Sequence, residues 1–362
     1  MKVLITGGHL SPALSVISEL QKGKHKILYV GRKYALEGDR AYSLEYQTIK
    51  DLDIPFFTIT TGRLQRKFTR YTVFSVFKLP VGLSQSFYIL NKFRPDVVLG
   101  FGSYVSLPVI IAASVLRIPV VIHEQTFGVG MANKIASTFA TKVCISWQTS
   151  KRFFPKQKIV LTGNPLRKEI MEVKKDKKFE NNPPLIYITG GSLGSHFINT
   201  LVKNSIRELT KNFQVFHQSG GAKKYKDFEE LEKLQNDRYE VKKFLTPKES
   251  AVMLKTSDIV VSRAGINTVS EIIFLQKPSV LIPLSVSQNN EQLRNASFVK
   301  ENHLGEVLEE KNATAQRLVS LIEKVYKNID SYKLSENLLA EDAALKIVEV
   351  LKNVNKKKKI KK

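Results

Sequence analysis

The stretch that decides the fold is Val3-Leu4-Ile5-Thr6-Gly7-Gly8-His9, a β-rich apolar run that ends in a glycine pair just before an amphipathic segment over residues 11–22. The same order of apolar run, glycine loop and amphipathic segment returns further along the chain. Runs without polar alternation, such as Val97-Val98-Leu99, are typical of central parallel strands that are covered on both faces. The pattern therefore predicts an α/β fold with parallel sheets and helices on both faces.

Apolar runs of strand length form two groups, one in each half of the chain. They cover residues 3–6, 26–31, 56–60, 96–100, 119–123, 142–146 and 159–162, and then 185–189, 214–217, 240–245, 258–262, 279–283 and 306–308. A chain of 362 residues also exceeds the size at which one hydrophobic core keeps growing. We therefore expect two doubly wound, Rossmann-like domains that face one another across a cleft.

A polar run over residues 174–184 separates the two groups of strands, and we place the domain boundary near Thr162-Gly163-Asn164-Pro165. The predicted domains are residues 1–163 and 164–334. A last helix is expected at about 335–352, packing back on the first domain. The lysine-rich residues 353–362 are expected to form a disordered tail.

The composition excludes a disordered or a fibrous protein. Hydrophobic residues make up 43% and charged residues 25%, which is ordinary globular composition. The net charge of +24 favours an acidic partner: nucleic acid, an anionic membrane surface or a phosphorylated substrate. The only cysteine, Cys144, excludes an intramolecular disulfide and a cysteine-rich zinc site. Residues 104–122 are interrupted by Pro108, Arg117 and Pro119, so we expect a buried helix and strand there rather than a membrane span, and the first apolar run is too short for a signal peptide.

Three glycine loops, at residues 6–9, 189–194 and 262–268, follow predicted strands and open predicted helices. In open parallel sheets, ligands bind at this edge, where helix N-termini favour anions. One such loop is weak evidence because glycine is common in tight turns, but three of them favour a diphosphate-bearing ligand. Neither a Gly-x-x-x-x-Gly-Lys-Ser/Thr nor a Gly-x-Gly-x-x-Gly motif is present, which disfavours a P-loop ATPase and a dinucleotide oxidoreductase.

Acidic and histidine side chains lie close to these loops. Glu271 is one helical turn beyond the third loop and can accept bonds from two ribose hydroxyls, although it could also be a solvated helix residue. His9 directly follows the first glycine pair, where a general base would be needed, although a structural role is commoner for a lone histidine. His123-Glu124-Gln125 ends another buried strand. Its adjacent His and Glu point to opposite faces and cannot form one dyad.

In this order, the motifs resemble those of the MurG family of two-domain GT-B glycosyltransferases, over almost the whole chain. The resemblance implies inverting transfer of N-acetylglucosamine from UDP-N-acetylglucosamine (UDP-GlcNAc) to the 4-hydroxyl of the muramoyl sugar of lipid I, which gives lipid II in peptidoglycan synthesis. The residues that carry it are Thr6-Gly7-Gly8-His9, residues 95–100, Gly102-Ser103-Tyr104-Val105-Ser106, His123-Glu124-Gln125, Gly163-Asn164-Pro165-Leu166-Arg167, residues 190–194, His217-Gln218-Ser219-Gly220, residues 262–265, Ser270-Glu271, Gln292 and Asn295-Ala296.

The resemblance also implies a role for individual residues. Thr6, Gly7 and Gly8 would face the acceptor diphosphate, His9 would be the general base, and Glu124 is the second candidate for that base. No metal and no cofactor is expected. The UDP-sugar would be held by Arg167, Ser192, Leu245, Ala264, Gly265, Ile266, Asn267, Thr268, Val269, Glu271 and Gln292, with Thr126 as a further donor contact.

Two positions depart from the family pattern. Ile5 leads straight into the first glycine loop, where family members usually carry a further glycine pair. Thr126 stands where the family usually has Asn, so a hydroxyl replaces an amide.

A lipid-anchored acceptor implies a peripheral protein at the cytoplasmic face of the cell membrane. Residues 63–94 interleave basic and aromatic side chains, which favours binding to an anionic membrane surface, and the lysine tail would add an electrostatic attachment. A core helix with a solvated face is the alternative interpretation. The side chains are Arg63, Arg66, Lys67, Arg70, Lys78, Lys92 and Arg94 with Phe68, Tyr71, Phe74, Phe77, Leu79, Phe87 and Tyr88.

Three alternative functions remain open from the sequence. Another GT-B glycosyltransferase with a different lipid acceptor would share the donor-side motifs, and a UDP-sugar epimerase of the same fold is more remote. The positive charge could also serve a nucleic-acid-binding protein. No helix-turn-helix or RNP-like pattern is evident, so no nucleic-acid partner is expected.

Overall fold

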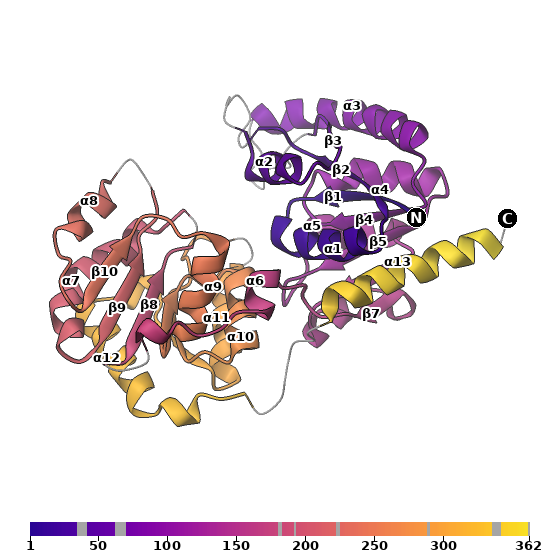
Figure 1. Cartoon of the computed structure of the whole chain (residues 1–362). Helices are drawn as coiled ribbons and strands as arrows, with labels where there is room; N and C mark the ends of the chain where they lie inside the picture. Colours follow the sequence, from indigo (N-terminus) through magenta and orange to yellow (C-terminus); the bar gives the residue numbers. More distant parts are fainter. Residues whose placement is uncertain are drawn as a thin grey trace. The chain divides into compact units, whose positions relative to one another are not determined.

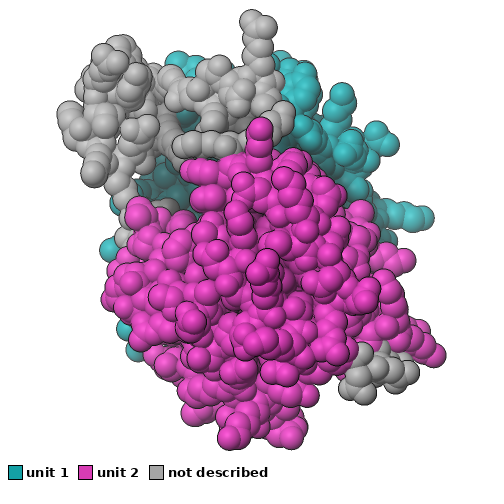
Figure 2. Space-filling view, turned by 90° about the vertical axis from the view of Figure 1, so that its left-hand side faces the viewer, with its two compact units in different colours: residues 1–167, 340–362 teal, residues 168–339 magenta. Residues whose placement is uncertain are grey.

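The computed structural model describes residues 1–34, 42–61, 70–179, 183–191, 193–221, 225–287, 290–334 and 342–360, with the backbone alone at 70–79 and 357–360 (Figure 1). The chain forms two compact units, which Figure 2 colours separately. Unit 1 is Met1–Arg167 with Ala340–Lys362, and unit 2 is Lys168–Leu339. Among the described helices, none combines the length and the apolar character that a membrane crossing requires.

Unit 1 is built on a parallel sheet in which the strand order is β3-β2-β1-β4-β5-β6-β7. Val3 of the central strand pairs with Ile27 on one side and Val97 on the other. The strands are β1 (Lys2–Gly7), β2 (Lys26–Gly31), β3 (Phe56–Thr58), β4 (Val97–Phe101), β5 (Val120–Glu124), β6 (Lys142–Ile145) and β7 (Ile159–Leu161).

Successive side chains of β1 point to opposite faces of this sheet and enter two separate cores. Val3 and Ile5 pack with α1 and α13, whereas Leu4 packs with α3, α4 and α5. The chain therefore leaves β1 and β4 toward opposite faces, which makes the edge between these two strands the switch point where ligands bind in open sheets. The helices are α1 (Leu10–Lys22), α2 (Leu44–Asp51), α3 (Arg70–Phe93), α4 (Ser106–Val115), α5 (Met131–Phe139) and α13 (Ala343–Ile360).

The lysine-rich end of the chain differs from the prediction. Residues 353–362 were expected to be disordered, but α13 continues through them to Ile360. Leu351 and Val354 are buried beside α1, which extends the apolar stripe into the predicted tail. Lysine is also a good helix former. Residues 335–341, where the predicted last helix begins, lie outside the described ranges, as do 361–362.

Unit 2 is a second parallel sheet, with the strand order β10-β9-β8-β11-β12-β13. The strands are β8 (Leu185–Thr189), β9 (Gln214–Gln218), β10 (Tyr239–Lys242), β11 (Ile259–Ser262), β12 (Ser279–Leu281) and β13 (Gly305–Val307). The helices are α6 (Lys168–Met171), α7 (His196–Asn212), α8 (Asp227–Glu232), α9 (Pro247–Thr256), α10 (Ile266–Leu275), α11 (Glu291–Glu301) and α12 (Ala315–Lys327). Helices α7 and α12 share one core, from which α10 is absent, so the chain diverges after β8 and β11 and the switch point lies between them.

Every predicted strand run overlaps an observed strand, and residues 104–122 form a helix and a strand as expected. The observed division falls between Arg167 and Lys168, slightly beyond the predicted one at 163/164. One contact explains the difference, because the Ser15 hydroxyl on α1 donates to the carbonyl of Leu166 at 2.8 Å. This bond keeps the chain with unit 1 past the Gly163 turn.

Candidate functional site

At the switch point of unit 1, the last residues of β1 and β4 approach each other closely. Gly7 has a φ of +138°, and a Cβ there would lie 2.7 Å from the backbone of Phe101. A Cβ on Gly8 would lie 2.8 Å from the Cβ of Ser103 in the loop after β4. Only glycines fit this approach, so the pair predicted from the sequence is required by the packing. Thr6 just before them is fully buried at the end of β1.

His9 is the N-cap residue of α1, and its side chain makes no capping hydrogen bond. The backbone N–H groups of the first turn of α1 are therefore left for a ligand, and an anion is the preferred one. Loss of hydration lowers the pKa of His9, and the negative charge of Glu124 acts in the opposite direction. Burial thus favours the neutral imidazole of His9, the form that can accept a proton, while the charge of Glu124 favours the protonated form. These are the properties of a general base.

Glu124, at the end of β5, is almost fully buried and uses both carboxylate oxygens locally. Its Oε1 accepts bonds from the N–H and the hydroxyl of Thr126, at 3.0 and 2.7 Å. Its Oε2 accepts from the N–H of Gly130 at 3.0 Å and from Nδ2 of Asn133 at 3.1 Å. Four donors around one carboxylate favour a role in shaping the β5–α5 loop over a role as the base that meets a substrate.

Thr126 and Asn133 both donate hydrogen bonds to Glu124. The Thr126 hydroxyl proton is committed to Glu124, so a donor sugar would meet this residue only through its remaining lone pairs. Asn133, which the sequence reasoning missed, also donates to the carbonyl of His123 at 2.9 Å. The only signal for Asn133 in the sequence is a polar residue on the buried face of an amphipathic helix.

Replacing Glu124 by glutamine should lower the free energy of unfolding by about 1–3 kcal/mol, because the new amide group would turn a donor toward at least one buried N–H. Urea unfolding measures this effect. The control is Glu172→Gln, in an exposed pair with Lys168, which should leave stability unchanged. If Glu124→Gln abolishes transfer at full stability, Glu124 is the base and His9 is not.

In unit 2, glycines bring together the loops that follow β8 and β9. Gly194 and Gly220 both have positive φ, and a Cβ on Gly194 would lie 2.0 Å from the carbonyl oxygen of Ser219. Ser195 begins α7 as its N-cap, with the side chain accepting from the N–H of Ile198. Ser192, predicted to hold the UDP-sugar, lies outside the described residues.

The third glycine loop opens α10. Gly265 is its N-cap without a side-chain cap, and a Cβ on Gly265 would meet no atom within 4 Å. The helix N-terminus is thus open at Ile266, Asn267 and Thr268, where backbone N–H groups favour an anion. Ala264 and Val269 are fully buried, so their side chains serve the core. Glu271 follows one turn later and is 8% exposed.

Arg263, which the sequence reasoning did not assign to the site, ties these loops together. Its Nε and Nη2 donate to the Ser195 hydroxyl at 3.1 and 2.8 Å. Its Nη1 lies 2.7 Å from a carboxylate oxygen of Glu310 and donates to the carbonyl of Ile282 at 3.2 Å. The only signal for Arg263 in the sequence is a basic residue between the end of β11 and Gly265. Its partners could not be predicted, because they come from three distant segments of the chain.

The other predicted donor residues lie around the same edge or at the unit boundary. Leu245 is partly buried just before Thr246, the N-cap of α9. Gln292 accepts the N–H of Leu284 through its Oε1 at 3.0 Å, which holds the loop before α11. Arg167 belongs to unit 1 and not to unit 2, where the predicted boundary had put it. Within the described ranges, no group of three or more His, Cys, Asp or Glu side chains could hold a metal ion.

Residues 6–145 match the glycosyltransferase family 28 N-terminal domain, and residues 185–354 match the glycosyltransferase family 28 C-terminal domain. Proteins of Lachnospira eligens and Clostridium botulinum (strain Langeland) are 31% and 33% identical to this chain, each over 98% of it and 99% of their own length. Both carry the name UDP-N-acetylglucosamine–N-acetylmuramyl-(pentapeptide) pyrophosphoryl-undecaprenol N-acetylglucosamine transferase.

Solved structures share the fold. The crystal structure of Acinetobacter baumannii MurG superposes with a TM-score of 0.75 at 24% identity, over 97% of this chain and 99% of its own. A UDP-GlcNAc 2-epimerase from Neisseria meningitidis bound to UDP-GlcNAc has a TM-score of 0.66 at 17% identity, over 98% of this chain and its full length. At these identities the likeness establishes the fold alone.

Proposed function

Because this chain belongs to the MurG family of glycosyltransferase family 28, we propose that it transfers N-acetylglucosamine from UDP-GlcNAc to the 4-hydroxyl of the muramoyl sugar of lipid I and so forms lipid II. The observation that carries this proposal is the likeness in sequence to two transferases of that name over nearly the whole of each chain. The structure adds a fitting chemistry at the switch point of each sheet.

For the donor, we assign the UDP moiety to unit 2. The open N-terminus of α10 at Gly265 suits a diphosphate, since the peptide dipoles and free N–H groups both favour negative charge. Glu271, one turn further along the same helix, suits the two ribose hydroxyls, because an ionised carboxylate can accept from both. Arg263 and Glu310 keep the neighbouring loop in place through Ser195.

For the chemistry, we assign the base to His9. The imidazole takes the proton from the acceptor 4-hydroxyl as that oxygen forms the new bond to C1 of the sugar. The bond between C1 and the donor phosphate oxygen breaks on the opposite face, which inverts the anomeric centre and releases UDP. The charge of Glu124 favours the imidazolium that results, consistent with its effect on the pKa of His9. Helix N-termini and Arg167 would stabilise the leaving diphosphate without a metal ion.

The test is incubation with UDP-GlcNAc and a lipid I analogue, followed by mass analysis of the product. The expected result is an acceptor heavier by one N-acetylglucosamine, formed equally well in excess EDTA. Conversion of UDP-GlcNAc in the absence of acceptor would instead indicate an epimerase. Transfer only to a different lipid would overturn the acceptor assignment, and turnover lost in EDTA and restored by magnesium would overturn the metal-free mechanism.

We also propose that the protein attaches peripherally to the anionic cytoplasmic face of the membrane through unit 1. Residues 63–69 of the predicted patch lie outside the described ranges, so the support comes from the layer of α3, α4 and α5. Three exposed apolar residues of α5 are spaced four apart and share one face of a helix that has no acidic residue. On α3, Lys92 lies over the exposed ring of Tyr88. Only the backbone of residues 70–79 is described, and among the described side chains the exposed apolar ones of this layer are Val81, Tyr88, Val115, Met131, Ile135 and Phe139.

The protein should bind vesicles of phosphatidylglycerol but not of phosphatidylcholine, and raised salt should weaken the binding because it screens charges over about 10 Å. Replacing Met131 and Ile135 together by serine should weaken binding while UDP binding stays unchanged. Truncation after Lys356 should weaken it further by removing lysines without touching Val354. Co-sedimentation measures each effect.

The control for this test is Leu345→Ser, which removes an exposed apolar side chain from the first turn of α13, away from the lysines at the other end of that helix and outside the core layer of α3, α4 and α5. It should leave vesicle binding unchanged. If the protein ignores anionic vesicles at low salt, the proposed membrane attachment is wrong.

A further inference from the structure

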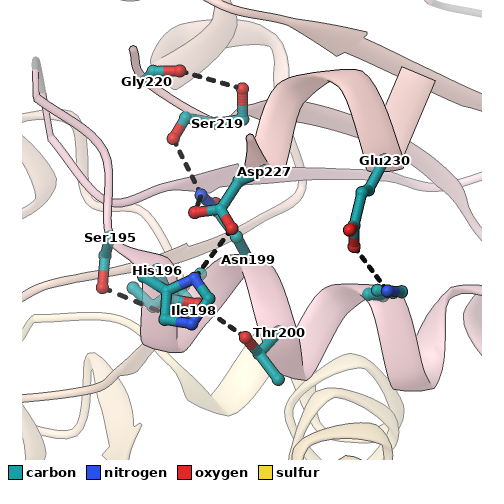
Figure 3. Close-up of polar contacts among 10 residues, drawn as sticks. Ser195, His196, Ile198, Asn199, Thr200, Ser219, Gly220, Asp227 and Glu230 are labelled. Carbon is teal, nitrogen blue, oxygen red and sulfur yellow. Dashed lines mark hydrogen bonds and ion pairs between the residues drawn. The ribbon is translucent and has the colours of Figure 1, made fainter. Parts of the chain in front are cut away.

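A polar cluster, buried at Asp227 and Asn199 and half exposed at His196, joins α7 to the start of α8 beside the glycine loops of unit 2. Figure 3 shows Asp227, the first residue of α8, between His196 and Asn199 of α7. One carboxylate oxygen of Asp227 lies 2.7 Å from Nδ1 of His196, and the other accepts from Nδ2 of Asn199 at 2.8 Å. The Asp227 side chain is 11% exposed and Asn199 is 3% exposed. A carboxylate this well buried needs hydrogen-bond donors around it.

Asn199 connects Asp227 to the loop that follows β9. Its Nδ2 also donates to the carbonyl of Ser219 at 3.0 Å, so the two amide protons of Asn199 serve Asp227 and the β9–α8 loop. The amide oxygen has no hydrogen-bond partner, so the orientation of the amide group depends on the two acceptors of its nitrogen, Asp227 and the Ser219 carbonyl. The Asp227 carboxylate, which can only accept, holds the amide with its nitrogen toward Ser219.

The carbonyl of Ser219 in turn packs against the backbone of the β8–α7 loop at Gly194. A Cβ on Gly194 would lie 2.0 Å from that oxygen, and a Cβ on Gly220 would lie 2.3 Å from the carbonyl oxygen of Leu193. The two loops thus meet through backbone atoms with no side chain between them to absorb a shift. Any movement of Ser219 moves Gly194, and with it the loop that precedes α7.

We propose that Asp227 is a positioning residue for the UDP-sugar donor, acting through Asn199 and His196 to hold the two glycine loops at the switch point where α10 also begins and where the diphosphate is assigned. This inference rests on the proposed donor function of unit 2. Asp227 itself does not touch the ligand in this arrangement. Its effect is on donor affinity and not on the proton transfer at His9, so donor KM should change and kcat should not.

A second link between the same two helices provides a matched control. Lys203 of α7 pairs with Glu230 of α8, and both side chains are about half exposed. Exposed pairs of this kind contribute little to stability and this one contacts neither glycine loop. Glu230→Gln removes an α7–α8 contact as Asp227→Ala does, but it leaves the connection to Ser219 intact.

The experiment measures UDP binding by calorimetry, donor KM and kcat, and the melting temperature of each variant. Asp227→Ala should raise the Kd for UDP and the donor KM by about tenfold, the order expected when one buried hydrogen bond of a supporting group is lost. Glu230→Gln should match the wild type. Asp227→Asn should restore most of the affinity, because its amide oxygen can still accept from Nδ2 of Asn199 and keep that contact in place.

If Asp227→Ala fails to fold, His196→Ala serves in its place, since His196 is 47% exposed and its loss leaves Asp227 with one contact fewer. A rise in Kd of about threefold is then expected. Wild-type affinity in Asp227→Ala or, in that case, in His196→Ala overturns the inference, and so does an equal loss in Glu230→Gln. A wild-type protein that does not bind UDP overturns the proposed function instead, before any variant is compared.

Discussion

Replacing His9 by alanine should lower kcat for sugar transfer by about 10²- to 10⁴-fold, the usual contribution of a general base. The acceptor hydroxyl is a poor nucleophile until its proton is removed, and His9 is the histidine at the switch point of unit 1, with a pKa that burial lowers. UDP binding should be unchanged in this variant, because unit 2 is assigned to the donor. Steady-state kinetics and calorimetry together measure both effects.

The pH profile gives a second readout for His9. A base works only when deprotonated, so kcat/KM should fall as the pH drops through the pKa of His9 in the free enzyme. Because burial lowers that pKa, the fall should lie on the acidic side of the ordinary histidine value. The control is His303→Asn, an exposed histidine with positive φ in unit 2, which should keep full activity. An unchanged kcat in His9→Ala would pass the role to Glu124.

Replacing Glu271 by alanine should raise the donor KM by about 10- to 100-fold, which corresponds to about 1–3 kcal/mol for hydroxyls left unpaired in a buried site. Glu271 is only 8% exposed on α10, so water cannot easily replace it. UDP should also bind more tightly to the wild type than 2′-deoxy-UDP does. Competition calorimetry with the two nucleotides measures this preference.

The control for the donor test is Glu301→Ala, which removes an exposed carboxylate at the end of α11 in the same unit. It should leave the donor KM unchanged. Equal affinity for the two nucleotides together with a silent Glu271→Ala would remove Glu271 from the ribose site. The diphosphate assignment at Gly265 would remain to be tested separately.

The strands and the glycine turns of this protein can be predicted from the sequence, because each depends on residues that are neighbours in the chain. Continuous apolar runs such as Val97-Val98-Leu99 predict central strands wherever they stand in the chain. Glycines at Gly7 and Gly265 mark the turns that follow strands, and at Gly7 the positive φ and the close backbone of Phe101 show why glycine is needed. The prediction failed at residues 353–360, where composition indicated disorder. Burial of Val354 against α1 overrides that composition, and no local rule reveals a distant partner.

The sequence by itself therefore determined the α/β class, the positions of the strands, the glycine loops and, through the resemblance of its motifs, the candidate residues His9 and Glu271. Only the tertiary structure decided what Glu124, Arg263 and Asp227 do. Glu124 is surrounded by four donors, Arg263 joins Ser195 to Glu310, and Asp227 orients Asn199 beside the glycine loops. Each of these roles depends on hydrogen-bond partners brought together by packing, and the direction of a buried amide or carboxylate is set by those partners and not by its neighbours in the chain.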